Sequence, residues 1–449
     1  MRNKLIVKTI STFIILIGTG CLLLILNGFR GNLKYSTITS ALFTSVSAVS
    51  VTGLSVIDLS KNLNFTGQLI VLLLIQFGGL GILTFSNWIF LTIRKKIDVQ
   101  GIVIIREIIG DSENINPVNI LIKTVLMTFF IEIIGAIALF IGFIRDFPLK
   151  KAIWYSVFHS ISAFCNAGFS LFSTSFNQYT GNFLINITLI ILIICGGLGF
   201  VVLIDLYYLL KNFILKKPWK LAINSKIVIY TSSLLILSGF IFFLTMEPQK
   251  NHNITFFQKV LSSLFLSVTS RTAGFNTILI KDLTNMSLIF LMFLMIVGAS
   301  PGSTGGGIKT TSLAIIFGII RGYLKNRKKI ELLDRSIPSK YAAKSIGVLI
   351  MYLSILFFSV IAIETFEAGF RSYSSANNNF ISYLFETISA MSTVGLSTGI
   401  TSTLSSKSLY ILMINMFAGK IGPLVLITSL IGEKPPLNYQ YPEADILVG

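Results

Sequence analysis

Four short segments of this chain combine small, hydroxyl-bearing and amide residues around a glycine that holds the same place in each. Every segment ends in a small or β-branched residue, the glycine and a large apolar residue. They are residues 47–54 (SAVSVTGL), 162–169 (SAFCNAGF), 268–275 (VTSRTAGF) and 389–396 (SAMSTVGL). The glycines recur at near-equal intervals, so we interpret the chain as one unit copied four times.

The chemistry that such segments can do is the binding of a dehydrated monovalent cation. Glycine has no Cβ and reaches backbone conformations that line carbonyl oxygens along an axis. Rings of carbonyl oxygens replace the hydration shell of K⁺, whereas Ca²⁺ and Mg²⁺ favour carboxylates. The segment cores contain no acidic residue, although Asp58 and Asp282 follow two of them and could draw cations to an outer mouth. Simple turn or helix-packing glycines are the alternative, which four copies in register disfavour.

The predicted ion-binding residues are the glycines and the residues just before them. Thr52, Asn166, Thr272 and Thr393 would add side-chain oxygens to the carbonyls. The full set is Val51, Thr52, Gly53, Asn166, Ala167, Gly168, Thr272, Ala273, Gly274, Thr393, Val394 and Gly395.

The composition places these segments in a membrane. Of 449 residues, 53% are hydrophobic and 12% are charged, against roughly 25% charged in a soluble domain. The mean hydropathy of +0.81 excludes a soluble enzyme. Three cysteines and two histidines are too few and too scattered for a disulfide framework or a transition-metal site. A membrane enzyme would need a cluster of intramembrane catalytic residues, and the sequence shows none.

The elements that position the segments are predicted to be helices. Apolar runs of ten to fourteen residues, such as 152–163 and 380–391, precede the segments and are too short to cross a bilayer, so we expect reentrant helices. Longer runs flank each segment. We place these eight spans at 8–28, 66–93, 119–143, 183–211, 226–245, 286–321, 345–366 and 408–431, which divides the chain into units 1–93, 94–212, 213–322 and 323–449.

The formal charge of +18 is interpreted as a topology signal and not as nucleic-acid binding. Most Lys and Arg residues fall on the side that holds both termini, so the positive-inside rule makes the termini cytoplasmic. The cluster Arg327, Lys328 and Lys329 fits that topology, with docking of an acidic partner or lipid as the alternative.

The third unit differs from the others in its second span. Each second span has a glycine-weakened centre, but residues 298–310 (GASPGSTGGGIKT) are nearly half Gly and Pro and cannot sustain an α-helix. A phosphate-binding loop is disfavoured because Ile308 separates the glycines from Lys309 and no strand precedes them. We predict a break that serves as a gate. The gate residues are Gly298, Ser300, Pro301, Gly302, Ser303, Thr304, Gly305, Gly306, Gly307, Lys309 and Thr310.

Among the charged residues within or beside predicted membrane segments, Lys420, Glu132, Asp205 and Glu386 are weighed for a function. Lys420 is near the middle of the last span, where a charge is costly and usually faces a cavity or partner. It would either repel K⁺ or hold the gate segment through backbone carbonyls, with a snorkelling lysine as the alternative. For Glu132, Asp205 and Glu386, structural pairing is favoured over a proton relay.

The fourfold arrangement of span, short helix, glycine segment and span resembles the Ktr/Trk/HKT superfamily of K⁺ transporters. The tail from Tyr441 to Gly449 makes the chain look most like a KtrB-type membrane subunit. The resemblance covers essentially the whole chain. It implies an all-α membrane protein with eight transmembrane helices and four reentrant pore helices around a pseudo-fourfold pore. It also implies that Gly53, Gly168, Gly274 and Gly395 are selectivity-filter glycines.

The resemblance further implies K⁺ uptake across the plasma (inner) membrane, channel-like and passive or activated by Na⁺. Expected partners are a second copy in a homodimer and a cytosolic KtrA-type ring that binds ATP or ADP. No cofactor is expected on this chain, since it has no Rossmann fingerprint. A Trk-type H⁺-coupled symporter is the near alternative. A secondary transporter of organic solutes is disfavoured, because its repeats would be inverted.

Overall fold

The structure is a computed structural model that describes residues 2–30, 35–81, 117–218, 220–247, 255–327, 329–369 and 379–423. The end of the predicted 66–93 span, the following basic loop, the end of the 408–431 span and the C-terminal tail lie outside the described residues.

Four long helices match the predicted first span of each unit. They are α1 (Arg2–Asn27), α7 (Pro117–Phe143), α11 (Ile223–Met246) and α15 (Ser339–Glu367). Each is long and apolar enough to cross a membrane, yet a third or less of each apolar window is buried inside the protein. The rest of their surface is therefore available to lipid acyl chains.

A shorter helix precedes each glycine segment. These helices are α2 (Tyr35–Ser50), α8 (Leu149–Phe164), α12 (Phe256–Thr269) and α16 (Phe380–Met391). Their C-terminal halves are buried, although the residues there include many serines and threonines. The short helices thus bring their C-terminal ends, which carry partial negative charge, into the protein interior.

The second helix of each unit begins at a side-chain cap. They are α4 (Phe65–Leu80), α9 (Phe183–Leu198), α13 (Asn285–Ile296) and α17 (Ser406–Ile421), and the side chains of Asn64, Asn182, Thr284 and Ser405 accept their first backbone N–H groups. Each of these helices is too short to qualify alone as a membrane span. The count of eight spans stays a prediction.

Two glycines three residues apart shape the end of the second helix in units one, two and four. Gly78, Gly196 and Gly419 lie so close to the last turn of their own unit's short helix that a Cβ would collide with the carbonyl oxygens of Val49, Phe164 and Met391. Gly81, Gly199 and Gly422 then adopt φ angles of 78°, 92° and 97° and end the helices. The glycine-weakened centres are therefore sites of close packing followed by helix termination.

The second and third units continue past this point in ways that the sequence predicts only in part. After Gly199 the chain turns through 108° into α10 (Phe200–Ile214), so the predicted 183–211 span is bent and is not one straight helix. In the third unit, α13 ends at Ile296 and α14 (Thr310–Leu324) begins at Thr310. Residues 297–309 between these helices are not helical, where the sequence predicts a break.

Contacts between units close a ring. The second helix of each unit contacts the short helix of the next, in the pairs α4 with α8, α9 with α12, α13 with α16, and α17 with α2. The largest buried apolar cluster lies mainly between the first two units, a second lies between the last two, and a third joins the fourth unit to the first. The four units therefore surround a common centre.

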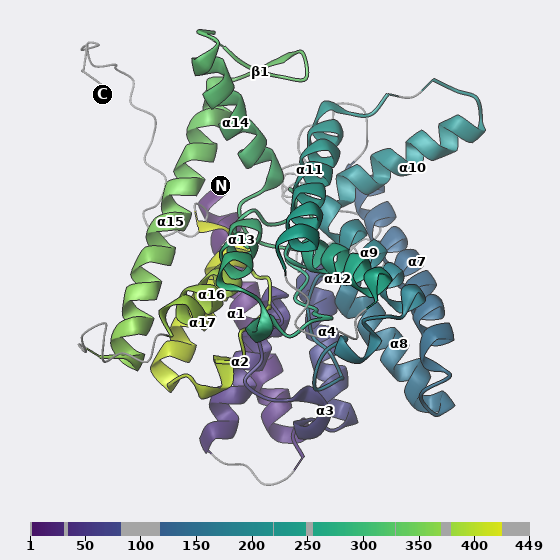
Figure 1. Cartoon of the computed structure of the whole chain (residues 1–449), viewed down its shortest axis with the longest axis vertical. Helices are drawn as coiled ribbons and strands as arrows, with labels where there is room; N and C mark the ends of the chain where they lie inside the picture. Colours follow the sequence, from purple (N-terminus) through teal and green to yellow (C-terminus); the bar gives the residue numbers. More distant parts are fainter. Residues whose placement is uncertain are drawn as a thin grey trace.

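Short elements lie at the two ends of the molecule. The helix α3 (Leu59–Asn62) and the 3₁₀ turns η1 (Asn177–Tyr179), η2 (Ile280–Asp282) and η3 (Thr401–Thr403) follow the glycine segments. At the opposite end, β1 (Ile330–Leu332) and β2 (Arg335–Ile337) form an antiparallel hairpin after α14 (Figure 1).

We predict that Gly196→Ala destabilises the protein. The added Cβ would collide with the Phe164 carbonyl, and such overpacking costs about 1–3 kcal/mol. Gly347→Ala in α15 is the matched control, because its Cβ would have no neighbour within 4 Å and alanine favours a helix. Thermal unfolding of the protein in detergent should give a lower midpoint for the first variant only. An equal midpoint for both variants would contradict the packing argument.

Candidate functional site

The four glycines of the repeated segments form a closed ring. A Cβ on each would collide with the carbonyl oxygen of the residue that precedes the glycine in the next unit. Gly53 meets Ala167, Gly168 meets Ala273, Gly274 meets Val394, and Gly395 meets Thr52. All four have positive φ, between 68° and 92°. The structure thus brings the four predicted segments together around one axis, with backbone contacts that only glycine permits.

The residue two places before each glycine is also in the left-handed region. These residues are Val51, Asn166, Thr272 and Thr393, with φ between 53° and 67°. Such a conformation costs a branched residue about 1–3 kcal/mol and persists only where surrounding bonds impose it. Ser47 and Ser389 accept the N–H of Gly53 and Gly395 at 3.0 and 3.1 Å, and Ser162 and Thr269 donate to the carbonyls of Phe169 and Phe275 at 2.8 and 2.6 Å. The hydroxyls of the repeat therefore hold a strained backbone in place.

The side-chain oxygens predicted near the carbonyls differ between units. The position that Asn166, Thr272 and Thr393 occupy is held by Val51 in the first unit, and the Thr52 hydroxyl instead lies 2.8 Å from that of Ser50. Thr272 Oγ1 is buried and has no hydrogen-bond partner in the described part of the chain. The ring is thus more uniform in its backbone than in its side chains.

A cavity of about 440 Å³ opens on the α3 side of the ring. All four glycines line it, together with polar residues such as Ser55, Asn276 and Thr401. Asp58 lines this cavity as well, whereas Asp282 is not among its lining residues. Of the two acidic residues predicted at an outer mouth, only Asp58 therefore reaches it.

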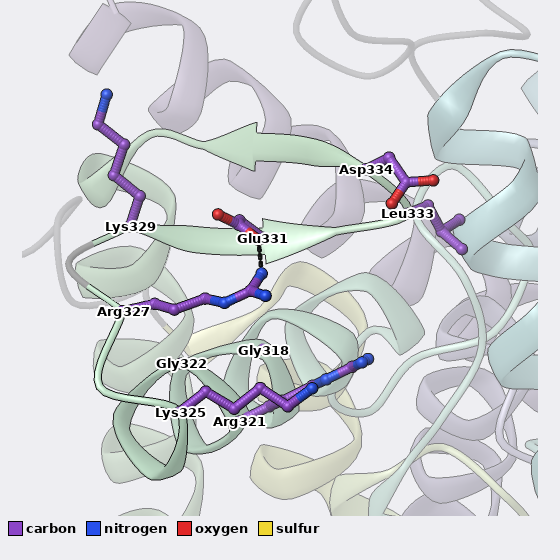
Figure 2. A pocket seen from close by; sticks show the side chains of 9 residues that line it. All are labelled: Gly318, Arg321, Gly322, Lys325, Arg327, Lys329, Glu331, Leu333 and Asp334. Carbon is purple, nitrogen blue, oxygen red and sulfur yellow. Dashed lines mark hydrogen bonds and ion pairs between the residues drawn. The ribbon is translucent and has the colours of Figure 1, made fainter.

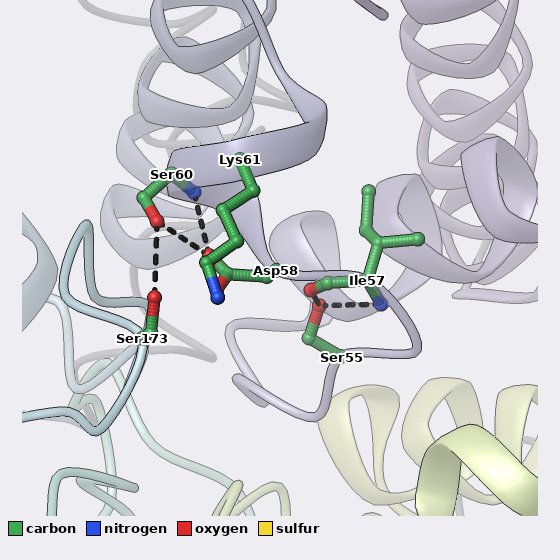
Figure 3. Close-up of polar contacts among 6 residues, drawn as sticks. All are labelled: Ser55, Ile57, Asp58, Ser60, Lys61 and Ser173. Carbon is green, nitrogen blue, oxygen red and sulfur yellow. Dashed lines mark hydrogen bonds and ion pairs between the residues drawn. The ribbon is translucent and has the colours of Figure 1, made fainter.

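Asp58 is held by its neighbours on the cavity wall (Figure 3). Its carboxylate accepts the N–H and hydroxyl of Ser60 at 2.9 and 2.6 Å, and Lys61 Nζ lies 3.6 Å away. Partial burial raises the pKa of Asp58, but hydrogen bonds from nearby serines and the charge of Lys61 outweigh it and leave that pKa below its ordinary value. The group is therefore negatively charged at neutral pH.

The predicted gate segment lies against the other side of the ring. A Cβ on Gly305 would collide with Thr272 Oγ1, and Gly306 N donates to Thr393 Oγ1 at 2.9 Å. Thr304 Oγ1 lies 3.2 Å from the Gly196 carbonyl oxygen. The segment therefore contacts residues of the second, third and fourth units directly beneath the glycines.

Hydrogen bonds to helix ends anchor the rest of the segment. Ser300 N donates to the Gly197 carbonyl at 3.0 Å, and the Gly302 carbonyl accepts Phe200 N at 3.0 Å. Within the segment, Ser300 Oγ and Thr310 Oγ1 are 3.0 Å apart. These bonds replace the helical ones that its Gly and Pro residues preclude.

Two lysines bind adjacent carbonyls of this segment. Lys420 Nζ, from α17, donates to the Thr304 carbonyl at 2.5 Å, and Lys309 Nζ donates to the Gly305 carbonyl at 2.8 Å. Lys420 thus makes the backbone contact that is one of the two roles considered for it.

The three carboxylates near membrane segments have polar partners. Glu386 in α16 accepts hydrogen bonds from Ser397, Thr398 and Thr401, between 2.7 and 3.2 Å, and so fixes the loop after the fourth glycine. Glu132 accepts Gln76 Nε2 at 3.1 Å. Asp205 accepts Ala222 N at 2.8 Å. These contacts support the structural pairing favoured for each.

Sequence reasoning missed the residue three places before each glycine. Cys165 Sγ lies 3.7 Å from Gln76 Oε1 and Ser392 Oγ lies 2.6 Å from the Tyr352 hydroxyl, so helices behind the ring brace these positions. In the third unit this position is Arg271. The Arg271 side chain is buried, and its Nε has no hydrogen-bond partner among the described residues. The sequence offered a signal for this position, because a positively charged arginine is unexpected in a repeat predicted to bind cations.

This ring of strained glycine loops, set among apolar helices long enough to span a bilayer, defines a membrane cation transporter and not an enzyme. The family model described as TrkH, cation transport protein, matches residues 2–436. The chain belongs to this family.

Relatives cover nearly the whole chain. It is 32% identical to the potassium/sodium uptake protein NtpJ of Enterococcus hirae over 97% of this chain and 95% of that protein. It is 33% identical to the Ktr system potassium uptake protein B of Vibrio alginolyticus, over 92% and 88%. The crystal structure of the potassium transporter TrkH from Vibrio parahaemolyticus shares the fold, with a TM-score of 0.72 at 19% identity, over 95% and 85% of the two chains.

We predict that Asp58→Asn lowers cation flux at low external concentration. The carboxylate charge raises the local cation concentration in the cavity, and salt screens this effect. Asparagine is also a good N-cap, so α3 should persist. Asp282→Asn removes an equal charge that does not line the cavity and is the matched control. Flux into vesicles should fall severalfold at low ionic strength for the first variant only, and an unchanged rate would contradict the role of Asp58.

Proposed function

We propose that this chain takes up K⁺ across the plasma membrane through the ring of Gly53, Gly168, Gly274 and Gly395. The observation that carries the proposal is the closed set of contacts between each glycine and the preceding carbonyl of the next unit. Backbone oxygens in rings suit a weakly hydrated monovalent cation. The names of the relatives, which are potassium or potassium/sodium uptake proteins, agree with this substrate.

The ion-binding set is the one predicted from the repeats. The residues before each glycine supply the carbonyls. The hydroxyl of Thr272, which has no partner among the described residues, adds an oxygen on the gate side of the ring. K⁺ would enter the 440 Å³ cavity, where the charge of Asp58 raises the local K⁺ concentration. It would then lose its hydration water as it passes from the cavity into the ring.

Residues 298–310 are proposed to be the gate. They lie against Thr272 and Thr393 and therefore obstruct the path on the far side of the glycines. Ile308 packs in an apolar cluster with Tyr352 and Met391, and hydrogen bonds attach the rest of the segment. The Lys420 contact with the Thr304 carbonyl is the shortest of these bonds. Transport would require the segment to withdraw, which frees Lys420 of α17 from the Thr304 carbonyl.

The finer points of transport are proposed from the resemblance to the family, with some support from the relatives' names. We propose a homodimer with N- and C-termini in the cytoplasm, activated by Na⁺ and controlled by a cytosolic nucleotide-binding ring of the KtrA type. The phrase "Ktr system" in the relatives' names supports a separate regulatory component, and "potassium/sodium" supports a role for Na⁺. K⁺ and Rb⁺ flux through the purified protein, with and without a Na⁺ gradient or a H⁺ gradient, separates a Na⁺-dependent system from a H⁺-coupled one.

Gly274→Ser should reduce the selectivity for K⁺ over Na⁺. A side chain at φ 78° is strained, and its Cβ would lie 2.5 Å from the Val394 carbonyl oxygen, so the ring must distort. We expect the permeability ratio to fall by roughly tenfold, equivalent to about 1.4 kcal/mol. Gly347→Ser, at a position with no neighbour within 4 Å, should keep the ratio. Unchanged selectivity of Gly274→Ser in reconstituted vesicles would contradict the proposal that the glycine ring is the selectivity filter.

Lys420→Met should increase K⁺ flux. A hydrogen bond from a charged group contributes about 1.5–3 kcal/mol, so its loss would favour the withdrawn gate by roughly tenfold or more. Lys407→Met, at an exposed position of the same helix, is the control. Lys420→Arg keeps the charge and a donor and should stay near the wild-type rate.

Lys420→Met could raise flux in two ways, by releasing the gate segment or by removing a positive charge that repels K⁺. A variant with a shortened gate segment separates these two causes. Deletion of residues 302–307 leaves Lys420 in place and should also raise flux and weaken its dependence on a regulatory partner. Reduced flux through this intact, folded variant would sink the gate proposal.

A further inference from the structure

A second cavity, of about 260 Å³, lies between the end of α14 and the β1–β2 hairpin (Figure 2). It is far in sequence and function from the glycine ring, and neither the transport path nor the gate uses it. Four basic side chains line it, namely Arg321, Lys325, Arg327 and Lys329, together with Glu331 and Asp334.

Two glycines of α14 create the space for this cavity. Gly318 lies directly beneath β1, where a Cβ would be 3.1 Å from Ile330 and 3.2 Å from Leu332. One turn later, a Cβ on Gly322 would have no neighbour closer than the Lys329 carbonyl at 3.8 Å. The hairpin thus rests on the helix at Gly318 and leaves a gap over Gly322.

The charges around the gap are only partly compensated. Arg327 forms an ion pair with Glu331, drawn as a dashed line in Figure 2. Arg321, Lys325 and Lys329 have no ion-pair partner in the described part of the chain. Arg321 lies in the last turn of α14, and Lys325 is the C-cap four residues later, so both lie near Gly318 and Gly322. Basic residues do stabilise a helix C-terminus, but this does not explain why the connection between α14 and the hairpin adds Arg327 and Lys329.

The surroundings place the cavity at a membrane surface. The end of α14 also exposes large apolar side chains, and the exposed fractions of Tyr323 and Leu324 are 86% and 78%. Aromatic and aliphatic residues next to a basic cluster are typical of the level of lipid headgroups. This is the side predicted to be cytoplasmic, where anionic lipids attract basic residues. The cavity walls carry no aromatic ring on which a nucleotide base could stack.

We propose that this cavity binds a phosphate group, with Arg321 and Lys325 as the principal donors, and that the headgroup of an anionic phospholipid is its source. Guanidinium and ammonium groups together provide forked and single donors for phosphate oxygens. The helix that carries these donors starts at Thr310, where the gate segment ends. A bound lipid would therefore restrain the helix that follows the gate segment. This consequence rests on the proposed gate, whereas the binding site does not.

The test measures lipid binding to the full-length protein in neutral detergent. Native mass spectrometry with added phosphatidylglycerol or phosphatidylcholine gives the affinity for each, and thermal stabilisation by inorganic phosphate tests a free ion. We expect wild type to prefer phosphatidylglycerol. The double variant Arg321→Gln with Lys325→Gln should lose that preference by roughly ten- to thirtyfold, as expected for two cations near a lipid surface. The pair Lys340→Gln with Lys344→Gln, exposed on α15 and outside the cavity, removes the same charge and should bind as wild type.

A second variant separates a built pocket from general attraction. Gly322→Leu keeps every charge, suits a helix and fills the gap, so it should also abolish the preference. Binding of inorganic phosphate, lost in both variants, with no preference for phosphatidylglycerol would keep the phosphate site and make a free ion its source. Wild-type binding in either variant, or no preference of wild type for either phosphate source over phosphatidylcholine, would overturn the proposal.

Discussion

The contact between each glycine of the ring and a carbonyl of the next unit is the constraint on which the rest of the structure depends. A glycine at positive φ lets two backbones approach more closely than any side chain would allow, and this happens four times around one centre. The approach is possible only if four segments far apart in sequence arrive at the same depth. The short helices end there, and the second helix of each unit packs against the short helix of the next. Strain at Val51, Asn166, Thr272 and Thr393 is the local cost of this arrangement.

Packing behind the ring keeps that strained backbone from relaxing. Tyr352 contacts Ser392, and Glu132 with Gln76 surrounds Cys165, so a long lipid-facing helix supports the ring in each of these two units. A polar group buried among apolar helices is costly unless it is paired, which makes each brace specific for one geometry. The outer faces of the same helices are apolar and need only match lipid. The contacts that fix the geometry of the ring therefore lie on the inner faces of α7 and α15.

Much of this could be predicted from the sequence, because repetition turns weak signals into strong ones. The four glycine segments, the short helix over 380–391 and the break in the third unit all follow from local composition. Single glycines are tolerated in α4 and α9, but a segment that is nearly half Gly and Pro cannot sustain a helix. The bend after Gly199 was not predicted, since a single glycine permits a turn without requiring it. Side-chain braces such as Glu132 with Gln76 join different units, and no local pattern indicates which distant residues will meet. The absence of Asp282 from the cavity has the same cause, because η2 and its neighbours decide where a loop carboxylate lies.

The third unit is best placed to hold a moving part, because it lacks the contact that locks the other three. In those units a glycine of the second helix packs on the last turn of the short helix, at Val49, Phe164 or Met391. The corresponding Gly298 instead packs on Gly306 of its own segment. The segment is joined to its neighbours by hydrogen bonds, including those to Gly196, Thr393 and Lys420. Such bonds exchange with water at a net cost of about 0.5–1.5 kcal/mol each, whereas a separated helix interface leaves apolar surface exposed. The end of α13 is therefore held mainly by its own segment and by hydrogen bonds, although Ile308 also packs in an apolar cluster with Tyr352 and Met391.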